Sequence, residues 1–352
     1  MITLGVLFGG KSGEHEVSLL SAYNVINALD KNKYNIVLIG ITREGEWSIY
    51  SGDIEKIPDG TWEYDDNNYR NFSLFTDETI RGIDIMFPVL HGTFGEDGTI
   101  QGLFEMIGKP YVGCGVLASS VAMDKISTKT ILEMNGIKTS PWISALKNEI
   151  ENNINDVITR IESVFKYPIF VKPSNMGSSV GISKSYNREE LVTALLEASR
   201  YDNRILIEKA ISGIEIEVAV LGNYELTVSY PGQIVSCNDF YDYDAKYLTG
   251  DASKIIIPAP LDNSVIENVR QIAAVAFRAI DGSGLSRIDF FIENDTNTVI
   301  LNEINTLPGF TNISMYPKLM EYIGISYSDL LDRLIDLGFE RYKLRKGLKF
   351  KK

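Results

Sequence analysis

The sequence predicts an α/β region followed by an α+β region, and three observations lead to this expectation. At the N-terminus, short apolar runs alternate with glycine-rich loops and amphipathic segments, as in a parallel sheet covered by helices. After about residue 115, the predicted strands are separated by turn-rich segments, including a glycine–serine hairpin. The chain has 352 residues, which suggests two or three domains.

Composition narrows the class of protein. Apolar residues make up 44% and charged residues 23%, as in soluble globular proteins, and the net charge of −13 argues against a general nucleic-acid binder. Two histidines, His15 and His91, exclude a histidine-rich zinc site. Two cysteines, Cys114 and Cys237, are too few for a disulfide framework, which fits a reducing compartment. Without a signal-peptide pattern or an apolar run of roughly 20 residues, we expect a cytoplasmic protein with no membrane contact.

The N-terminal elements alternate between strands and helices. Apolar runs predict buried strands over 2–8, 35–41 and 83–90, while helical spacing of apolar residues predicts helices over 17–29 and 101–107. The polar, acidic segment 51–70 is expected to form a surface excursion with little core. Ligands of parallel sheets bind at the carboxyl ends of strands, where the loops 9–16 and 91–98 lie.

The rest of the chain shows no internal repeat. Asp124 is a plausible N-cap for a helix over 125–134. Further helices are expected over 158–165, 188–199, 264–280 and 327–337. Strands are expected over 167–172, 180–184, 205–209, 214–221, 225–228, 286–293 and 298–304. The end of the chain, 341–352, contains seven Lys or Arg and no acid. We expect a frayed, solvated tail there, with contact to a polyanion as the alternative.

The first loop matches a phosphate-binding pattern that its context contradicts. Residues 5–12 satisfy the P-loop pattern GxxxxGK(S/T), but residues 6–8 continue the apolar strand, so the first glycine would lie inside the sheet. Glu14 and Glu16 stand where the helix begins and would repel a triphosphate. Glu14 at a helix N-terminus suits a substrate ammonium group better.

The strongest chemical signal lies in the last predicted hairpin. A turn centred on residue 296 places Asp289 opposite Glu303. Alternate residues of a strand share a face, so Arg287 and Asn305 join that face. Two carboxylates and an amide oxygen suit Mg²⁺ bridged to nucleotide phosphates. The alternative is a surface ion pair between Arg287 and the acids.

Three further signals are weaker when each is taken alone. Lys172 precedes a Gly/Ser hairpin, 177–181, that could close over phosphates or be an ordinary turn. The strand that ends in Glu208 and Lys209 could be a hinge whose backbone reads a base edge, or simply a strand leaving the core. The polar, aromatic loop 237–254 is typical of an active-site lid, or of a solvated surface loop.

Taken together, these motifs resemble the D-alanine–D-alanine ligase family of the ATP-grasp fold. The matching blocks follow the family's order: FGGKSGEHEVS (8–18), PVLHGTFGEDGTIQG (88–102), MDK (123–125), VKPSNMGSSVG (171–181), IEKAISGIE (207–215), YDYDAKY (241–247), RIDFF (287–291) and LNEINTLPGFTNISMYP (301–317). The resemblance implies an N-terminal parallel α/β (preATP-grasp) domain over 1–114, a central ATP-grasp subdomain with the phosphate loop over 115–211, and a C-terminal subdomain with the Mg²⁺ site and lid over 212–352.

The resemblance also implies an activity. The family joins two D-alanines through a D-alanyl phosphate while cleaving ATP, for peptidoglycan precursor synthesis, and its members lead us to expect a homodimer. Two Mg²⁺ ions, with Mn²⁺ as a substitute, would assist. Phosphoryl transfer and acyl transfer depend on positioning and charge stabilisation rather than on a protein nucleophile. Such chemistry needs little histidine.

Roles carry over residue by residue where the motifs match. For the metal ions, the resemblance implies Asp289, Glu303 and Asn305, with Glu303 bridging two ions. For ATP, it implies Lys125, Lys172, Gly177, Ser179, Val180 and Lys246 at the phosphates, Glu208, Lys209 and Ile211 at adenine, and Glu215 at the ribose. For the amino acids, it implies Glu14 with Ser178 and Tyr247 at the first ammonium, Val17 and His91 near the first substrate, Arg287 and the Gly309 N–H as an oxyanion hole, and Ser314 and Met315 at the second carboxylate.

The acceptor is partly indicated by the sequence. D-lactate-using relatives replace the Lys-Tyr pair of the lid, whereas Lys246 and Tyr247 are intact here. D-serine-using relatives commonly carry arginine where this chain has Met315, so D-alanine is favoured and a D-alanine–D-serine ligase is the alternative. A noncatalytic nucleotide-binding module fits less well, because it would not need Arg287 and Glu14 together. A different ATP-grasp ligase also fits less well, because it would have another N-terminal loop.

Overall fold

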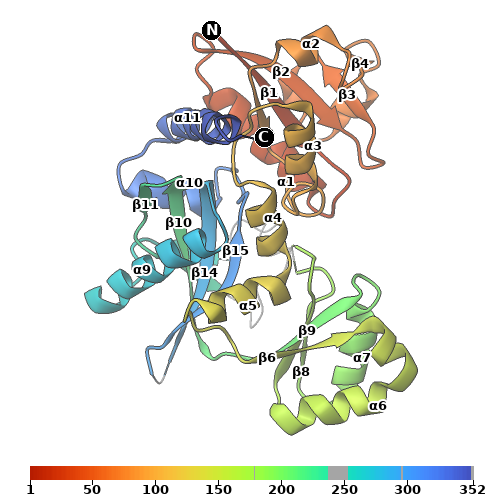
Figure 1. The fold of residues 1–352 in the computed structure, drawn as a ribbon, viewed down its shortest axis with the longest axis vertical. Coiled ribbons are helices and arrows are strands. Elements are labelled where there is room, and N and C mark those ends of the chain that lie inside the picture. Colours follow the sequence, from red (N-terminus) through yellow and green to blue (C-terminus); the bar gives the residue numbers. More distant parts are fainter. Residues whose placement is uncertain (178, 237–252, 295, 350–352) are drawn as a thin grey trace.

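The computed structural model describes residues 1–177, 179–236, 253–294 and 296–349. These residues form three sheets arranged along the long axis of the molecule (Figure 1). The N-terminal sheet lies at one end, a four-stranded sheet at the other, and a six-stranded sheet between them. Each sheet falls within one of the three predicted stretches, although the boundaries themselves stay a prediction.

The N-terminal sheet has the strand order β4-β3-β2-β1-β5, and β1 runs parallel to both β2 and β5. The strands are β1 (Ile2–Gly9), β2 (Tyr34–Ile41), β3 (Trp47–Tyr50), β4 (Tyr69–Asn71) and β5 (Ile85–Pro88). The helices are α1 (His15–Ala28), α2 (Glu78–Gly82) and α3 (Thr99–Ile107). The next helix, α4 (Val116–Met123), places Ala118 and Ala122 in the core of the six-stranded sheet. Because β1 passes through Gly5, that glycine is part of the sheet, which confirms that the first loop is not a P-loop.

The segment 51–70 corrects one expectation. It folds through two short 3₁₀ helices, η1 (Ile54–Lys56) and η2 (Thr61–Tyr64). Trp62 is only 1% exposed and meets the ring of Phe8 edge-on, with 4.9 Å between centroids. A Cβ on Gly40 would lie 2.3 Å from the Trp62 ring, so the glycine leaves room for it. The prediction of little core was wrong because Ile57 and Trp62, which stand among polar residues in the sequence, are both buried in the core.

The four-stranded sheet is antiparallel and has the order β6-β9-β7-β8. Its strands are β6 (Trp142–Leu146), β7 (Ile169–Pro173), β8 (Ser183–Ser185) and β9 (Arg204–Lys209), and its helices are α6 (Lys147–Val164) and α7 (Arg188–Ala198). Before it runs α5 (Lys125–Met134), whose N-cap Asp124 accepts a hydrogen bond from the Ser127 N–H at 2.8 Å, as predicted. Helix α6 is longer than expected because its first half is mostly polar.

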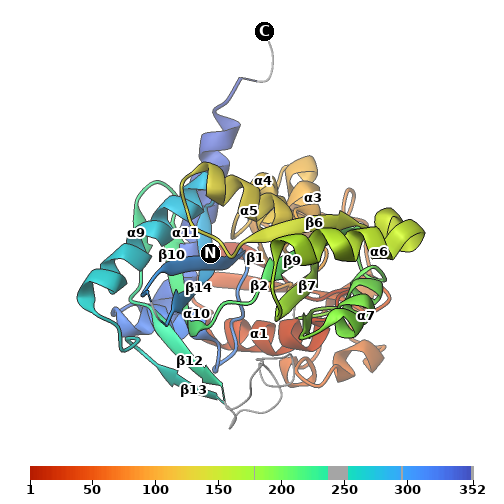
Figure 2. The same ribbon diagram turned by 90° about the horizontal axis from the view of Figure 1, so that it is seen from below.

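The six-stranded sheet contains the predicted hairpin. Its strands are β10 (Gly213–Gly222), β11 (Leu226–Val228), β12 (Gly232–Ser236), β13 (Ser253–Ile256), β14 (Gly284–Glu293) and β15 (Val299–Asn305). Helix α9 (Asn263–Ala279) lies between β13 and β14 in the sequence, and α10 (Met315–Tyr322) and α11 (Tyr327–Lys346) follow β15. Asp289 pairs with Glu303 and Arg287 with Asn305, as the turn symmetry predicted. The register shifts beyond Asp289, so the symmetry holds only on that side of the irregularity. Seen along the long axis, α9 lies on the side opposite α6 and α7 (Figure 2).

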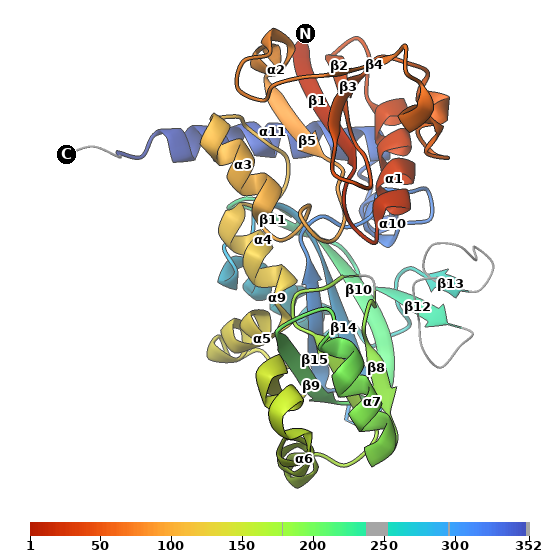
Figure 3. The same cartoon turned by 90° about the vertical axis from the view of Figure 1, so that its right-hand side faces the viewer.

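The end of the chain also differs from expectation. Helix α11 continues to Lys346 and lies beneath the N-terminal sheet (Figure 3). The Arg341 guanidinium stacks 3.9 Å from the ring centre of Tyr111, and Arg345 contacts Glu105 at 3.0 Å. The expected frayed tail was therefore wrong for residues 341–346, where basic side chains bind the protein itself. No helix in the described ranges has the length and apolarity to cross a membrane.

We expect Trp62→Ala to destabilise the protein by about 3–5 kcal/mol, because it empties a packed site that Gly40 and Phe8 cannot fill. Tyr64, two residues away and 82% exposed, supplies a matched control whose change to Ala should cost less than about 0.5 kcal/mol. Equilibrium denaturation measures both, and equal effects would contradict the burial argument.

Candidate active site

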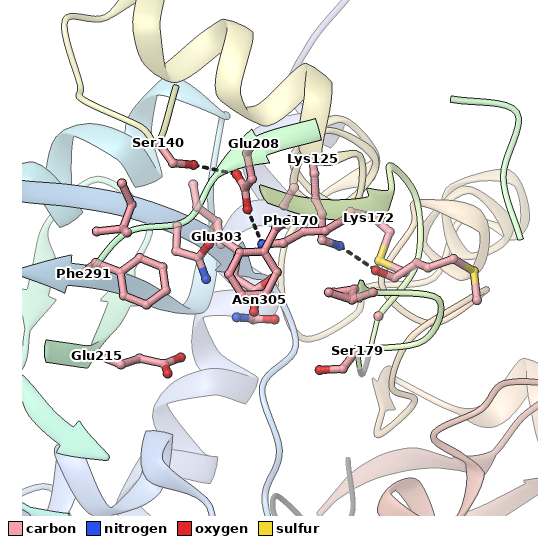
Figure 4. Close-up of a pocket in the computed structure, with 18 of the residues that line it drawn as sticks. Lys125, Ser140, Phe170, Lys172, Ser179, Glu208, Glu215, Phe291, Glu303 and Asn305 are labelled. Carbon is pink, nitrogen blue, oxygen red and sulfur yellow. Dashed lines mark hydrogen bonds and ion pairs between the residues drawn. The ribbon is translucent and has the colours of Figure 1, made fainter. Parts of the chain in front are cut away.

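A cleft between the four-stranded and six-stranded sheets brings most of the predicted nucleotide-site residues together. It holds about 1480 Å³ of empty space, including its open mouth. The predicted residues that line it are Glu14, Lys125, Lys172, Gly177, Ser179, Glu208, Lys209, Ile211, Glu215, Glu303 and Asn305. Figure 4 shows Lys125 and Lys172 on one side of the cleft and Glu303, Asn305 and Glu215 on the other. Lining residues that the sequence analysis missed include Glu96, Phe170, Met176, Lys184 and Phe291.

A buried charge network holds the wall of the cleft. The Glu208 carboxylate contacts Lys129 at 2.8 Å and also Lys172, and the Ser140 hydroxyl donates to it at 2.6 Å. Burial acts to raise the pKa of Glu208, but the two lysines outweigh it and hold that pKa well below its usual range. We predicted Glu208 beside adenine. Its carboxylate is engaged with lysines, so its backbone is the part suited to a base.

Lys129 is a residue that the sequence analysis missed. It is 2% exposed, and its Nζ also lies 2.7 Å from the Ser140 Oγ. Burial lowers its pKa, an effect that Glu208 opposes. Lys129 stands four residues after Lys125 on α5, and that spacing puts both side chains on one face of the helix. This four-residue spacing is the feature of the sequence from which Lys129 could have been predicted.

The predicted metal-binding face carries an ion pair. Arg287 donates to Asp289 through Nε at 2.8 Å and through Nη2 at 2.7 Å, and its Nε lies 3.1 Å from Glu217. The Asn305 amide donates to Asp289 at 3.1 Å. Asp289 is 2% exposed, so this is not the surface ion pair that was the alternative. Glu217 was missed because it reaches Asp289 through the pairing of β10 with β14, a register that no local pattern reveals.

The phosphate side of the cleft is built from α5 and the Gly/Ser hairpin. Lys125 donates to the Met176 carbonyl at 2.5 Å, and burial lowers its pKa. The hairpin is tight, with the Val180 N–H donating to the Gly177 carbonyl at 3.1 Å. Ser179 has a φ of 60°, the left-handed conformation. The predicted residues Ser178, Lys246 and Tyr247 lie outside the described residues.

Two carboxyl groups, of the buried Glu14 and the half-buried Glu96, meet beside the first loop. Glu14 is 7% exposed, and a Cβ on Gly92 would lie 2.5 Å from its Oε2, so the loop after β5 passes very close to it. Glu96 accepts hydrogen bonds from the Gly92 N–H at 2.8 Å and the Leu307 N–H at 3.1 Å. Burial and then the Glu14 charge raise the pKa of Glu96. A cation at this point would relieve the repulsion between the two carboxyl groups.

His91 lies in the wall of this site. It is 4% exposed, and its Nδ1 lies 3.0 Å from the Leu307 carbonyl while its Nε2 lies 3.0 Å from the Ser21 Oγ. Burial lowers its pKa to about 4, so the ring is neutral near pH 7. Both nitrogens are engaged by the protein, and contact of His91 or of buried Val17 with a substrate remains a prediction.

The loop after β15 carries the predicted acceptor residues. The Ser314 Oγ accepts a hydrogen bond from the Thr311 N–H at 3.0 Å. A Cβ on Gly309 would lie 2.8 Å from that same oxygen, so the glycine backbone approaches Ser314 closely. Met315 begins α10 and is 5% exposed. The structure therefore groups Gly309 with Ser314 in one turn.

Comparison with known proteins assigns the family. The family models described as "D-ala D-ala ligase N-terminus" and "D-ala D-ala ligase C-terminus" match residues 3–114 and 131–336. The chain belongs to the D-alanine–D-alanine ligase family. It is 49% identical to the D-alanine–D-alanine ligase of Ruminiclostridium cellulolyticum, covering 97% of this chain and 96% of that protein. It is 50% identical to that of Thermoanaerobacter sp. strain X514, covering 96% and 97%.

Solved structures agree with this membership. The D-alanine–D-alanine ligase of Coxiella burnetii superposes with a TM-score of 0.86 at 37% identity, covering 98% of this chain and 96% of that one. The VanG D-Ala:D-Ser ligase of Enterococcus faecalis also gives 0.86, at 38% identity, covering 96% and 99%. These members of the ligase family have the ATP-grasp fold with an N-terminal domain, which confirms the predicted fold class.

We expect Lys129→Met to cost about 3 kcal/mol of stability, because it leaves the buried Glu208 carboxylate with one lysine in place of two. Lys147 offers a matched control, since it makes only an exposed contact of 3.9 Å with Glu151. Lys147→Met should cost less than about 0.5 kcal/mol. Urea denaturation of both variants measures the difference, and a loss at Lys129 as small as that at Lys147 would refute the buried network's importance.

Acid should weaken the fold partly through His91. Its folded-state pKa is about 4 against an ordinary 6.5, so below pH 6.5 the unfolded chain takes up a proton that the folded protein refuses. Stability therefore falls as pH drops from 6.5 towards 4, by about 2 kcal/mol between pH 7 and pH 5 from this group. In His91→Asn, the difference in unfolding free energy between these two pH values should shrink by that amount. An unchanged difference would contradict the assignment.

Proposed function

We propose that this protein joins two D-alanine molecules into D-alanyl-D-alanine while ATP is cleaved to ADP and phosphate, supplying a peptidoglycan precursor. Membership of the ligase family, with relatives about half identical over nearly the whole chain, supports the activity. The observation that carries the proposal is the cleft itself. It sets Lys125 and Lys172 opposite Glu303 and Asn305, with Glu14 at its wall.

The nucleotide would lie along this cleft. Lys125 and Lys172 supply positive charge for the phosphates, and the hairpin 177–180 would cover them. Lys172 can exchange its contact with Glu208 for phosphate oxygens, since Lys129 remains to neutralise the carboxylate. The remaining family roles fit the lining: the segment from Glu208 through Lys209 to Ile211 would meet adenine, Glu215 the ribose, and Lys246 the γ-phosphate.

The donor set fits magnesium. Asp289 and Glu303 face each other across the hairpin with Asn305 beside them, and carboxylate and amide oxygens are the ligands that Mg²⁺ prefers. Two Mg²⁺ ions, or Mn²⁺ as a substitute, would be held here, with Glu303 between them. Bound ions would neutralise phosphate charge. Arg287 now holds Asp289, so metal binding there would let this guanidinium turn towards substrate.

The two amino-acid subsites follow from the remaining residues. Glu14, beside Glu96, would hold the first ammonium group, with Ser178 and Tyr247 as further partners and Val17 and His91 nearby. The first carboxylate would take the γ-phosphoryl group, and the amine of the second D-alanine would then displace phosphate. Arg287 and the Gly309 N–H would stabilise the oxyanion that forms. Ser314 and Met315 would bind the second carboxylate.

D-alanine is the acceptor we favour. One similar structure is named a D-Ala:D-Ser ligase, but Met315 stands where D-serine-using relatives commonly carry arginine. The relatives from Ruminiclostridium and Thermoanaerobacter are named D-alanine–D-alanine ligases. A cytoplasmic location and a homodimer complete the proposal, both expected from the family.

Phosphate release from Mg-ATP, with D-alanine, D-serine or D-lactate as acceptor and with product identification, tests the activity. We expect dipeptide mainly with D-alanine. Glu303→Gln should lower kcat by about 100-fold or more, because it removes a metal-binding charge. Lys11→Ala should change it by less than about twofold, because Lys11 is an exposed residue outside the cleft. Failure to form D-alanyl-D-alanine would overturn the proposal, and loss of activity in Lys11→Ala with full activity in Glu303→Gln would contradict the assigned metal site.

A further inference from the structure

A buried hydrogen-bond chain ties the N-terminal domain to the loop after β15. The Leu307 N–H donates to Glu96 at 3.1 Å, and the Leu307 carbonyl lies 3.0 Å from the His91 Nδ1. Three residues on, the Phe310 N–H donates to the Ser21 Oγ at 3.2 Å. Ser21 belongs to α1 and is completely buried. Side chains of the N-terminal domain therefore fix both ends of a four-residue backbone segment.

The direction of every bond in this chain follows from chemistry. A carbonyl oxygen only accepts, so the His91 Nδ1 carries the hydrogen that goes to Leu307. The ring is buried and neutral, which leaves its Nε2 as an acceptor. The Ser21 hydroxyl must then donate to Nε2, 3.0 Å away, while its lone pair accepts from Phe310. The one Ser21 hydroxyl therefore bonds to both groups: it donates to the His91 ring and accepts from the Phe310 N–H.

The same histidine is held from the first loop. The Ser12 hydroxyl donates to the His91 carbonyl at 2.7 Å and accepts from the Glu14 N–H at 2.9 Å. A continuous path therefore runs from Glu14, through Ser12 and His91, to Leu307. It joins the loop placed at the first substrate to the loop placed at the second.

We propose that Ser21 is a positioning residue for the ligation. Acting through His91, it sets the segment 307–310, and with it the Gly309 N–H, at a fixed place relative to the Glu14 loop. The inference rests on the proposed function. Gly309 lies between two residues that are anchored by buried hydrogen bonds, and these bonds restrict how far its N–H can move. Misplacement of a reacting geometry by about 1 Å can cost 100-fold in rate.

Loss of this link should affect the second step more than the first. Within the described part of the structure, Lys125 bonds to Met176 and Lys172 to Glu208, neither of which belongs to this hydrogen-bond chain. The acyl phosphate should therefore still form. With the acceptor side misplaced, water can take the acyl group in place of the amine. Acyl phosphate and water then give back D-alanine and phosphate, and ATP is spent without a peptide bond.

The experiment compares phosphate and dipeptide produced by the full-length enzyme in the same reaction. Wild type should give one phosphate per dipeptide. In Ser21→Ala, the ratio should rise to about 2 or more, and kcat/KM for the acceptor should fall roughly 10- to 100-fold. The KM for ATP should stay within about twofold of wild type. His91→Gln retains an acceptor for Ser21 but loses the Leu307 bond, and should also raise the ratio.

Ser119→Ala is the matched control. Ser119 is also completely buried, but its hydroxyl has no hydrogen-bond partner among the described residues. Its ratio and kinetic constants should match wild type. A ratio near one in both Ser21→Ala and His91→Gln would overturn the inference, whether activity is kept or falls equally for phosphate and dipeptide. Absence of dipeptide from wild type would instead overturn the proposed function.

Discussion

The cost of burying charge governs the design of this cleft. A chain with a net charge of −13 has to present positive groups to an anionic nucleotide, and it does so with lysines that are half-buried, as Lys172 is, or buried, as Lys129 is. Unpaired, such charges would destabilise the fold by several kcal/mol each. Glu208 compensates both Lys129 and Lys172, and Asp289 with Glu217 does the same for Arg287. Local pairing, rather than net charge, therefore sets what the site can bind.

The sequence allowed prediction of those features that depend on residues close together along the chain. The pairing of Asp289 with Glu303 follows from the symmetry of one short turn, and the Asp124 cap from its place before an amphipathic run. Residues that act across long separations were missed. Glu217 depends on the register between β10 and β14, and Ser21 on the docking of α1 against a loop nearly 290 positions later. Nothing local encodes such contacts.

His91 illustrates the same difference between what is local in the sequence and what depends on long-range contacts. The family resemblance led us to expect chemistry that needs little histidine. The prediction placed His91 near the first substrate. The structure adds that its neutral ring contacts Leu307 and Ser21, while its backbone carbonyl accepts from the Ser12 hydroxyl. A group with one donor and one acceptor on opposite sides of a rigid ring is well suited to that use.

The packing of α11 beneath the N-terminal sheet has a consequence for biosynthesis. A single hydrophobic core contains Leu4 and Phe8 of the first strand together with Leu330 and Leu334 of the last helix. A ribosome releases these two parts at opposite ends of translation. The N-terminal sheet is synthesised first, and the apolar face that α11 covers therefore stays exposed until almost the whole chain has been made. Truncation near the C-terminus would expose that face, although it removes no residue of the cleft.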